Sequence, residues 1–269
     1  MKVLRNIGGL KKAISETRNL GFVPTMGGLH KGHVSLIRKS QTKCKKTLVS
    51  IYVNPKQFNK SKDFLNYPRN LKKDFKILKK LKIDFLYLPK TKEIFKEKNK
   101  KIILPQVQKK LCAKSRKGHF EGVLNIMSRF IKLIKPKYIF MGEKDFQQLY
   151  LINKFIIKKY TSKIYKCKTI RDKNFLALSS RNFLLNKKNI IYAGFIAKSL
   201  YKFKYKLKNI NKINKFILSK KKELTNNFGI KIEYLEARNE SDLGVYKSKS
   251  KFRLFIAYYI DNIRLIDNF

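Results

Sequence analysis

The segment that decides the fold reads Leu20-Gly21-Phe22-Val23-Pro24-Thr25-Met26-Gly27-Gly28 and continues as Leu29-His30-Lys31-Gly32-His33. The apolar run at its start predicts a strand, and the glycine pair predicts the turn that ends it. Beyond the turn, apolar and small residues recur at helical spacing from Val34 to Cys44. The segment therefore predicts a strand, a glycine-rich turn and a helix, in that order.

The same alternation continues along the chain. Apolar runs predict strands at 48–53, 83–88, 138–141 and 164–170, with a short one at 102–104, and helical spacing predicts helices at 71–81, 123–134 and 146–157. Strands that alternate with helices predict βαβ units and a mostly parallel sheet with helices on both faces. Ligands of such sheets bind beyond the carboxyl ends of the strands. The distinctive polar residues follow such ends, after Val23, Val53, Met141 and Ile170.

The pattern of alternating strands and helices ends at about residue 175. Two helices are expected at about 187–207 and 211–227. Ile230, Ile232 and Tyr234 alternate with polar residues, which predicts a half-exposed antiparallel strand. Residues 254–260 and 263–266 then read as a hairpin. We expect an α/β domain with a doubly wound parallel sheet over residues 1–174 and a smaller C-terminal α+β domain over 175–269.

The composition is strongly basic, with 65 Lys and Arg against 17 Asp and Glu and a formal net charge of +48. Such a charge suits nucleic-acid binding. However, the lysines are scattered through every segment, and Asn and Ile are also abundant, which fits compositional drift at indifferent surface positions. A dedicated nucleic-acid protein should concentrate its charge on one element. We therefore expect no specific nucleic-acid partner, but a surface that attracts anions.

Three cysteines, Cys44, Cys112 and Cys167, lie far apart in the sequence. An odd number without a C-x-x-C pair argues against a disulfide framework or a zinc site. The N-terminus lacks the apolar stretch of a signal peptide, and no run approaches the roughly 18 apolar residues of a membrane span. These features predict a cytoplasmic protein without a membrane partner.

Two of the three histidines, His30 and His33, follow the glycine turn and open a helix. A helix N-terminus offers N–H groups and a positive dipole to an anion, and glycines let the backbone approach phosphates closely. Imidazoles three residues apart share one helix face and can donate hydrogen bonds to a reacting phosphoryl oxygen. The H-x-G-H pattern therefore predicts adenylyl transfer. A metal site is the weaker alternative, because no nearby carboxylate or thiol completes a ligand set.

Three other groups of residues indicate a function only when they are considered together with the H-x-G-H motif. Gly142-Glu143-Lys144-Asp145 follows a strand, so its lysine can reach phosphate and its acids can accept from ribose hydroxyls or help to hold Mg²⁺. Ser179-Ser180-Arg181 suits a phosphate clamp. Gln57 and Gln148 can bind hydroxyls and a carboxylate without neutralising a nucleophile. Taken alone, residues 142–145 fit a solvated loop as well as a phosphate site. Ser179-Ser180-Arg181 alone fits a helix cap better than a phosphate clamp, and isolated glutamines such as Gln57 and Gln148 are usually surface residues.

In this order, the motifs resemble the pantothenate synthetase family closely. The matching stretches are 23–33, Ser50-Ile51-Tyr52-Val53-Asn54-Pro55-Lys56-Gln57-Phe58, Tyr67-Pro68-Arg69, Gly118-His119-Phe120-Glu121-Gly122-Val123, 142–149, Leu178-Ser179-Ser180-Arg181-Asn182 and 264–268. H-x-G-H alone indicates only the nucleotidylyltransferase superfamily, which includes class I tRNA synthetases. Its combination with V-N-P-x-Q-F and G-E-K-D-x-Q-Q is more specific.

The resemblance implies a Rossmann-like ATP domain, a C-terminal lid domain and a homodimer. It also implies an ATP-dependent ligase with three small-molecule substrates, pantoate, β-alanine and ATP with Mg²⁺, and no prosthetic group. Pantoate would attack ATP to give pantoyl-adenylate and pyrophosphate, and β-alanine would then release AMP and pantothenate.

Carried over by position, the ATP site comprises Met26, Gly27, Gly28, Leu29, His30, Lys31, Gly32, His33, Gly142, Glu143, Lys144, Asp145, Ile170, Leu178, Ser179, Ser180 and Arg181. Within it, the resemblance gives the catalytic roles to His30, His33, Lys144 and Arg181, with His33 as the usual proton donor. Gln57 and Gln148 would hold pantoate, Gln57 would also lie near β-alanine, and Arg116 and His119 would border the same cavity.

The chain departs from the family pattern at Asn174-Phe175, where relatives usually carry Asp-Gly. Phenylalanine restricts that turn if the turn needs positive φ. Two alternatives to the ligase remain. One is a tRNA-directed adenylating enzyme, for which the chain lacks a K-M-S-K-S loop and an obvious anticodon-binding region. The other is a non-enzymatic RNA-binding protein descended from such an enzyme.

Overall fold

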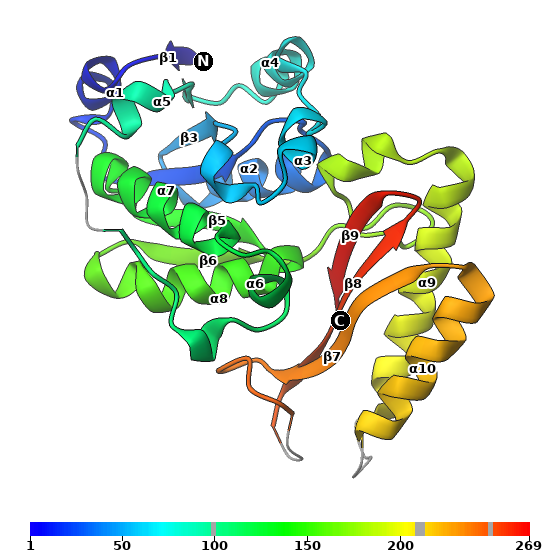
Figure 1. Ribbon diagram of the computed structural model, residues 1–269. Helices are drawn as coiled ribbons and strands as arrows, with labels where there is room; N and C mark the ends of the chain where they lie inside the picture. The colour runs from blue at the N-terminus through cyan, green and yellow to red at the C-terminus, as the bar shows by residue number, and fades with distance from the viewer. Residues whose placement is uncertain (98–100, 208–212, 247–249) are drawn as a thin grey trace. The chain divides into compact units, whose positions relative to one another are not determined.

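The computed structural model describes residues 1–97, 101–207, 213–246 and 250–269, which form two compact units (Figure 1). The first unit contains Met1–Lys109 and Arg116–Thr169, and the second contains Lys110–Ser115 and Ile170–Phe269. The division of function expected between residues 1–174 and 175–269 stays a prediction.

A six-stranded parallel sheet forms the centre of the first unit. Its strand order is β1-β4-β3-β2-β5-β6, and every neighbouring pair is parallel. The strands are β1 (Lys2–Leu4), β2 (Leu20–Thr25), β3 (Lys46–Ile51), β4 (Phe85–Tyr87), β5 (Tyr138–Gly142) and β6 (Lys163–Cys167). The predicted doubly wound α/β fold is therefore confirmed.

The strand order reverses next to β2. From β2 the chain first moves to β3 and β4 on one side, and later returns to place β5 and β6 on the other. The carboxyl ends of β2 and β5, which we call the switch-point edge, are where doubly wound sheets open a crevice for a ligand.

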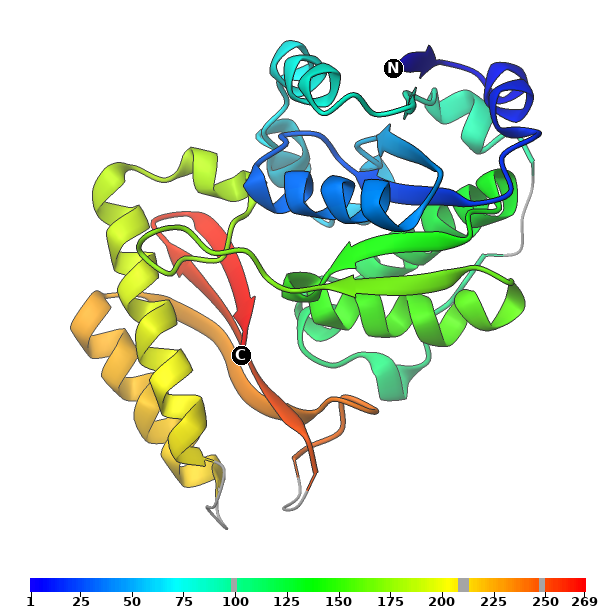
Figure 2. The ribbon, with the colours of Figure 1, turned by 180° about the vertical axis from the view of Figure 1, so that it is seen from behind.

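Helices cover both faces of this sheet because successive strand residues point to opposite faces. Val23 packs in one core cluster with Ile37 of α2 (Lys31–Lys43) and Leu78 of α4 (Leu71–Lys80). Its neighbour Phe22 packs edge-to-face against Phe130 of α7 (His119–Ile134), with ring centroids 5.7 Å apart. Figures 1 and 2 show α2 and α7 on opposite sides of the sheet. The α7 side also carries α1 (Ile7–Ile14) and α8 (Phe146–Phe155).

The second unit packs two helices, α9 (Lys187–Lys206) and α10 (Ile213–Phe228), against a three-stranded antiparallel sheet. Its strands are β7 (Lys231–Asn239), β8 (Phe252–Ile260) and β9 (Ile263–Asn268). The short helix α6 (Cys112–Ser115) belongs to this unit, since the Cys112 thiol lies 2.9 Å from the Tyr234 hydroxyl of β7. The predicted smaller α+β domain, with its closing hairpin, is confirmed.

Two strand predictions were wrong in detail. Residues 102–104 form no strand: the Ile102 N–H donates to Asn125 Oδ1 of α7, and the Ile103 side chain is 77% exposed. The strand predicted at 164–170 ends at Cys167, because its partner β5 ends at Gly142, the residue paired with Cys167. The sequence also missed β1 and α1, and the predicted helix start at 211–212 lies outside the described residues.

The remaining short elements are η1 (Pro55–Gln57), α3 (Ser61–Leu65), α5 (Thr91–Ile94), η2 (Gln106–Gln108), η3 (Glu143–Asp145), η4 (Ile157–Lys159) and η5 (Ser180–Leu184), in which η marks a 3₁₀ helix. In the described ranges, no helix is both long and apolar enough to cross a membrane.

Candidate active site

The turn after β2 requires glycine for its backbone. Gly27 and Gly28 have φ of +78° and +61°, in the left-handed region that side chains disfavour. A Cβ on Gly27 would lie only 3.0 Å from Asp74 Oδ2 and 3.2 Å from Ile51 Cγ2. Thr25 Oγ1 accepts a hydrogen bond from the Gly27 N–H at 3.2 Å. Both conformation and space therefore demand the glycine that the sequence places here.

The buried carboxylate of Asp74 binds this turn. Its two oxygens accept hydrogen bonds from the Gly28 N–H at 2.9 Å and from the Leu29 N–H at 2.8 Å. The N–H groups of Gly28 and Leu29, two residues that the resemblance assigned to the ATP site, thus point at a carboxylate of the chain itself. No motif of the sequence singled out Asp74, although a signal exists: Asp74 shares the apolar face of α4 with Phe75 and Leu78, where an acid is unexpected.

The two motif histidines cap helix α2 with their rings. His30 is the N-cap residue, and its Nδ1 accepts from the Gly32 N–H at 3.1 Å. His33 Nδ1 accepts from the His30 N–H at 3.4 Å, and the ring centroids lie 4.1 Å apart. Because Nδ1 of each ring is an acceptor, a neutral ring carries its proton on Nε2. Both imidazoles are thereby held in the tautomer that leaves Nε2–H as the outward donor.

Burial keeps both rings neutral. It lowers the pKa of His30 from 6.5 to about 3, helped by the electrostatic interaction with the His33 ring and by the positive charge of Lys144, and opposed by the negative charge of Asp145. Burial also lowers the pKa of His33 to about 4, with Lys144 as the second cause. Near pH 7 the pair therefore consists of two uncharged hydrogen-bond donors beside a lysine.

Lys144 reaches the histidines from the adjacent strand end. It lies in η3, directly after β5, and β5 is hydrogen-bonded to β2. Its ammonium lies 3.5 Å from Asp145 Oδ1, and its side chain is 15% exposed. Gln148 follows in the first turn of α8 and is half-buried. The switch-point edge thus gathers an ammonium group and two neutral donors contributed by two loops.

Gln57 ends the short helix η1 and is buried. Its side-chain amide donates to the sulfur of Met26 at 2.6 Å. Helix α7 holds η1 closely, since Asn54 Nδ2 donates to the Gly122 carbonyl at 3.1 Å and a Cβ on Gly122 would lie 2.2 Å from the Lys56 carbonyl oxygen. The glycine of the G-H-F-E-G-V stretch therefore permits the contact that places Gln57.

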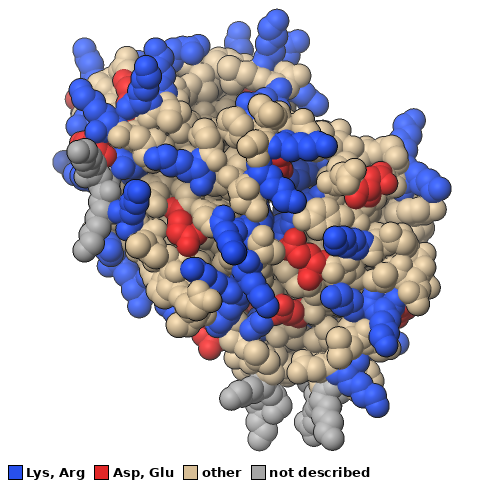
Figure 3. Space-filling model, viewed as in Figure 1, with Lys and Arg blue, Asp and Glu red and all other residues tan. Residues whose placement is uncertain are grey.

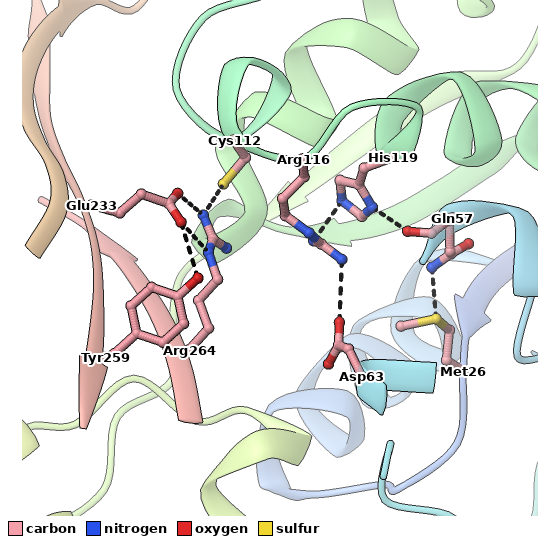
Figure 4. A network of polar contacts seen from close by, with 9 residues as sticks. All are labelled: Met26, Gln57, Asp63, Cys112, Arg116, His119, Glu233, Tyr259 and Arg264. Carbon is pink, nitrogen blue, oxygen red and sulfur yellow. Dashed lines mark hydrogen bonds and ion pairs between the residues drawn. The ribbon is translucent and has the colours of Figure 1, made fainter. Parts of the chain in front are cut away.

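A chain of polar contacts holds the backbone of Gln57 (Figure 4). His119 Nδ1 donates to the Gln57 carbonyl at 2.6 Å, and its Nε2 accepts from Arg116 Nη1 at 3.0 Å. Arg116 Nη2 in turn lies 3.5 Å from an Asp63 carboxylate oxygen. Of the two residues that the resemblance placed near the cavity, His119 therefore contacts the backbone of Gln57 directly, and Arg116 contacts His119. Nothing in the sequence singled out Asp63.

The other predicted nucleotide residues form one loop of the second unit. The Leu178 N–H donates to the Ile170 carbonyl at 2.9 Å, and Ser179 caps η5 by accepting from the Arg181 N–H at 3.3 Å. Ser180 is buried, and Arg181 is half-buried. The structure thus brings Ile170 together with 178–181, and separately brings the histidine pair together with Lys144.

The unusual Asn174-Phe175 pair lies in the same loop. Phe175 has φ of +76°, so the turn does take the conformation that favours glycine. Its ring packs against Tyr201, with centroids 5.1 Å apart, and under the Arg171 guanidinium at 4.7 Å. Arg171 is itself held by a bidentate ion pair with Asp267 at 2.7 and 3.0 Å. Aromatic packing therefore offsets the backbone strain.

The chemistry available at the switch-point edge is that of an anion site. Two neutral N–H donors and an ammonium can stabilise charge that develops on phosphate oxygens, and as preplaced groups they need no reorganisation. In the part of the chain that the structure describes, no group of three or more His, Cys, Asp or Glu residues could hold a metal ion.

Comparison with known proteins places the whole chain. The family model for pantoate-beta-alanine ligase matches residues 2–269. The chain is 37% identical over 268 residues to pantothenate synthetase of Flavobacterium psychrophilum, covering 96% of this chain and 94% of that protein. It is 38% identical over 265 residues to pantothenate synthetase of Francisella philomiragia, covering 97% and 92%.

Solved structures agree with this assignment. The crystal structure of pantoate-beta-alanine ligase from Francisella tularensis, complexed with beta-gamma ATP and beta-alanine, has a TM-score of 0.84 and 35% identity, covering 100% of this chain and 97% of that one. The Thermus thermophilus enzyme has a TM-score of 0.90 and 26% identity, covering 100% and 99%. With the family model and these relatives matching along nearly its whole length, the chain belongs to the pantoate–β-alanine ligases, a family of ATP-binding enzymes of pantothenate biosynthesis.

Proposed function

We propose that this chain condenses pantoate with β-alanine through a pantoyl-adenylate intermediate, releasing pyrophosphate and then AMP. The observation that carries the proposal is the pair of half-buried, neutral imidazoles beside Lys144 at the switch-point edge. The Francisella tularensis relative, which binds ATP and β-alanine, supports the same substrates.

In the first step, a pantoate carboxylate oxygen attacks the α-phosphorus of ATP. A P–O bond forms, the bond to the β-phosphate oxygen breaks, and the leaving group is pyrophosphate. Negative charge rises on the phosphate oxygens during attack. The Nε2–H groups of His30 and His33 donate to these oxygens, and Lys144 neutralises part of the charge. A neutral imidazole stabilises this charge through the hydrogen bond that its Nε2–H donates, and it keeps that proton throughout the step.

In the second step, the amine of β-alanine attacks the acyl carbon and AMP leaves. Gln57 and Gln148 hold pantoate as neutral amides, so they do not quench its carboxylate, and Gln57 also lies near β-alanine. Met26, Lys31, Gly142, Glu143, Asp145 and the backbone of Ile170 complete the nucleotide site, while Leu178, Ser179, Ser180 and Arg181 bind phosphates from the second unit. Mg²⁺ arrives with ATP.

Acyl-adenylates hydrolyse in water, so a C-terminal domain that closes over the site would protect the intermediate from water. We therefore propose that residues 175–269 act as a lid over the ATP and pantoate domain of residues 1–174. We also propose that the protein is a homodimer, as the resemblance to the family implies, and that it is cytoplasmic.

The direct test is exchange of labelled pyrophosphate into ATP. We expect exchange that requires pantoate and Mg²⁺, and AMP release once β-alanine is added. Exchange driven by an amino acid in place of pantoate would favour a tRNA-directed enzyme. Absence of exchange in pure, folded protein, together with tight and salt-sensitive RNA binding, would favour a non-enzymatic RNA-binding protein.

A further inference from the structure

Asp74 lies away from the motifs, yet it is among the most buried charged residues of the first unit, with 2% exposure. Both of its carboxylate oxygens are used, one by the Gly28 N–H and the other by the Leu29 N–H. Hydrogen bonds from N–H groups to an ionised carboxylate are about twice as strong as bonds between neutral partners. This bidentate contact links helix α4 to the glycine turn, 45 residues earlier in the chain.

The contact fixes the residues that immediately precede the histidine pair. Leu29, whose N–H is bound, is followed by His30, the extended N-cap residue with φ of −137° and ψ of 176°. Since the His30 N–H donates to His33 Nδ1, the backbone position of His30 also sets the His33 ring. A shift of the turn would therefore move both imidazoles together.

We propose that Asp74 is a positioning residue that holds the glycine turn so that His30 and His33 present their Nε2–H groups to the nucleotide. The inference rests on the proposed function for its ligand, but its geometric part concerns only Asp74 and the two rings. Asp74 touches neither substrate nor reacting atoms in this role, and acts through the backbone of Gly28 and Leu29.

The chain offers a matched control in Asp84. Its carboxylate also binds a backbone N–H of the central sheet, that of Thr47 at 2.8 Å, and accepts from Lys46 Nζ at 2.8 Å. Thr47 lies at the start of β3, at the opposite edge of the sheet from the glycine turn. Asp84→Asn therefore weakens a comparable carboxylate–backbone contact without touching the histidine loop.

The experiment compares Asp74→Asn with Asp84→Asn in the full chain. In Asp74→Asn, the side-chain amide faces one of the two N–H groups with its own donor, so one bond is lost. We expect both variants to melt a few degrees below wild type. Only Asp74→Asn should raise the KM for ATP and lower kcat, by about 10²-fold in kcat/KM, since misplacing catalytic groups by about 1 Å costs that much. Equal kinetic parameters in the two variants would overturn the proposal.

A second readout does not depend on ligase activity. NMR titration of the histidine ring protons in Asp74→Asn should show the pKa of His30 and of His33 rising toward 6.5, because a released turn exposes both rings to water. In Asp84→Asn both should stay as low as in wild type. If wild type shows no pantoate-dependent exchange, the proposed function fails, while this titration still decides the role of Asp74.

Asp74→Glu covers the case in which Asp74→Asn does not fold. It keeps the carboxylate but displaces its oxygens by one methylene. We expect it to fold with weakened ATP binding by calorimetry, whereas wild-type affinity within about twofold would refute positioning by Asp74.

Discussion

At the scale of single residues, the surroundings of the two imidazoles set their protonation state and their tautomer. His30 and His33 are ordinary histidines whose Nδ1 atoms are engaged by backbone N–H groups and whose rings are shielded from water. Because cationic Lys144 is nearby, protonation of either ring costs still more free energy. The result is a pair of neutral donors that keep their hydrogen at Nε2.

We expect His33→Ala to lower pantoate-dependent pyrophosphate exchange by about 10²–10³-fold, the usual cost of losing one preplaced donor. Melting temperature should fall by a few degrees at most, because one helix-capping hydrogen bond is lost, and circular dichroism should match wild type. Thr42→Ala, which removes a local hydrogen bond to the Lys39 carbonyl near the other end of α2, is the control and should keep full exchange. Near-normal exchange by His33→Ala would refute its assigned role.

The lowered pKa values also predict how stability depends on pH. The folded-state pKa values, about 3 for His30 and about 4 for His33, lie below the ordinary 6.5, so the unfolded chain takes up protons first as pH falls. The stability contributed by the neutral rings is therefore full above about pH 6.5 and is lost as pH falls, down to about pH 4 for His33 and about pH 3 for His30.

Urea unfolding at about pH 7.5 and about pH 5 should show a loss of about 1–2 kcal/mol for each histidine. His33→Gln lacks one of the two titrating rings, so its free energy of unfolding should fall less over the same interval. An equal fall in the variant and in wild type would contradict the low pKa of His33.

Phe175 illustrates a residue held against its backbone preference. Its positive φ costs about 1–2 kcal/mol for any residue with a Cβ, while its ring packs against Tyr201 and Arg171. We expect both Phe175→Ala and Phe175→Gly to lose stability, by about 1–3 kcal/mol for the missing ring. The glycine variant should be the more stable of the two by about 1 kcal/mol, because only alanine keeps the strain. Chemical denaturation measures the difference, and a more stable alanine variant would rule out strain at this turn.

At the scale of elements, the contact between α7 and η1 sets the position of a predicted substrate residue. Gly122 lets the helix approach the Lys56 carbonyl, and Asn54 fixes the approach with a hydrogen bond to the Gly122 carbonyl. His119, the first residue of the same helix, donates to the Gln57 carbonyl, and Arg116 and Asp63 continue this polar chain behind His119. Gln57 is thus placed by the first turn of α7 as well as by its own short helix η1.

Gly122→Ala should force η1 away from α7, because its Cβ would overlap the Lys56 carbonyl oxygen. We expect a loss of about 1–3 kcal/mol in stability, typical of overpacking, and a raised KM for pantoate. Gly8→Ala in α1 is the control, since its Cβ would make only an ordinary 3.7 Å contact and should be neutral or stabilising. An unchanged KM for pantoate in folded Gly122→Ala would refute the link between this contact and Gln57.

At the scale of the whole molecule, the dominant property is the net charge of +48. Figure 3 shows Lys and Arg side chains spread over the visible face, with few acidic residues among them. Most of these cations repel one another across water, so folding brings like charges together at a cost. The charge is therefore a property of the surface as a whole, whereas Lys144 is a local feature of the site.

Salt should accordingly stabilise this protein. Raising the ionic strength from about 0.01 M to about 0.15 M shortens the Debye length from about 30 Å to about 8 Å and screens the repulsion. We expect the melting temperature to rise by several degrees over this range, and weak binding to a generic polyanion such as heparin to disappear. Sucrose at matched osmolality is the control for non-ionic effects. A melting temperature that falls with salt would show that attractive ion pairs outweigh the repulsion.

Much of the fold could be predicted from local spacing. Apolar runs and helical periodicity located β2, β3 and α7, since the side-chain period alone tells which face an element buries. The prediction failed at residues 102–104, where apolar residues lie without a strand neighbour. A strand forms only beside another strand to which it can hydrogen-bond, and the sequence of the segment itself does not show whether such a neighbour is present.

The sequence by itself determined the order of elements, the glycines of the turn and the residue types of the site. Only the tertiary structure revealed Asp74 beneath the turn, Asp63 behind Arg116 and the attachment of α6 to the second unit. Only it could show that the histidines are neutral, because a pKa depends on burial and on Lys144, more than a hundred residues further along the chain. Local spacing fixes which groups a segment offers, whereas the three-dimensional fold fixes which groups surround them.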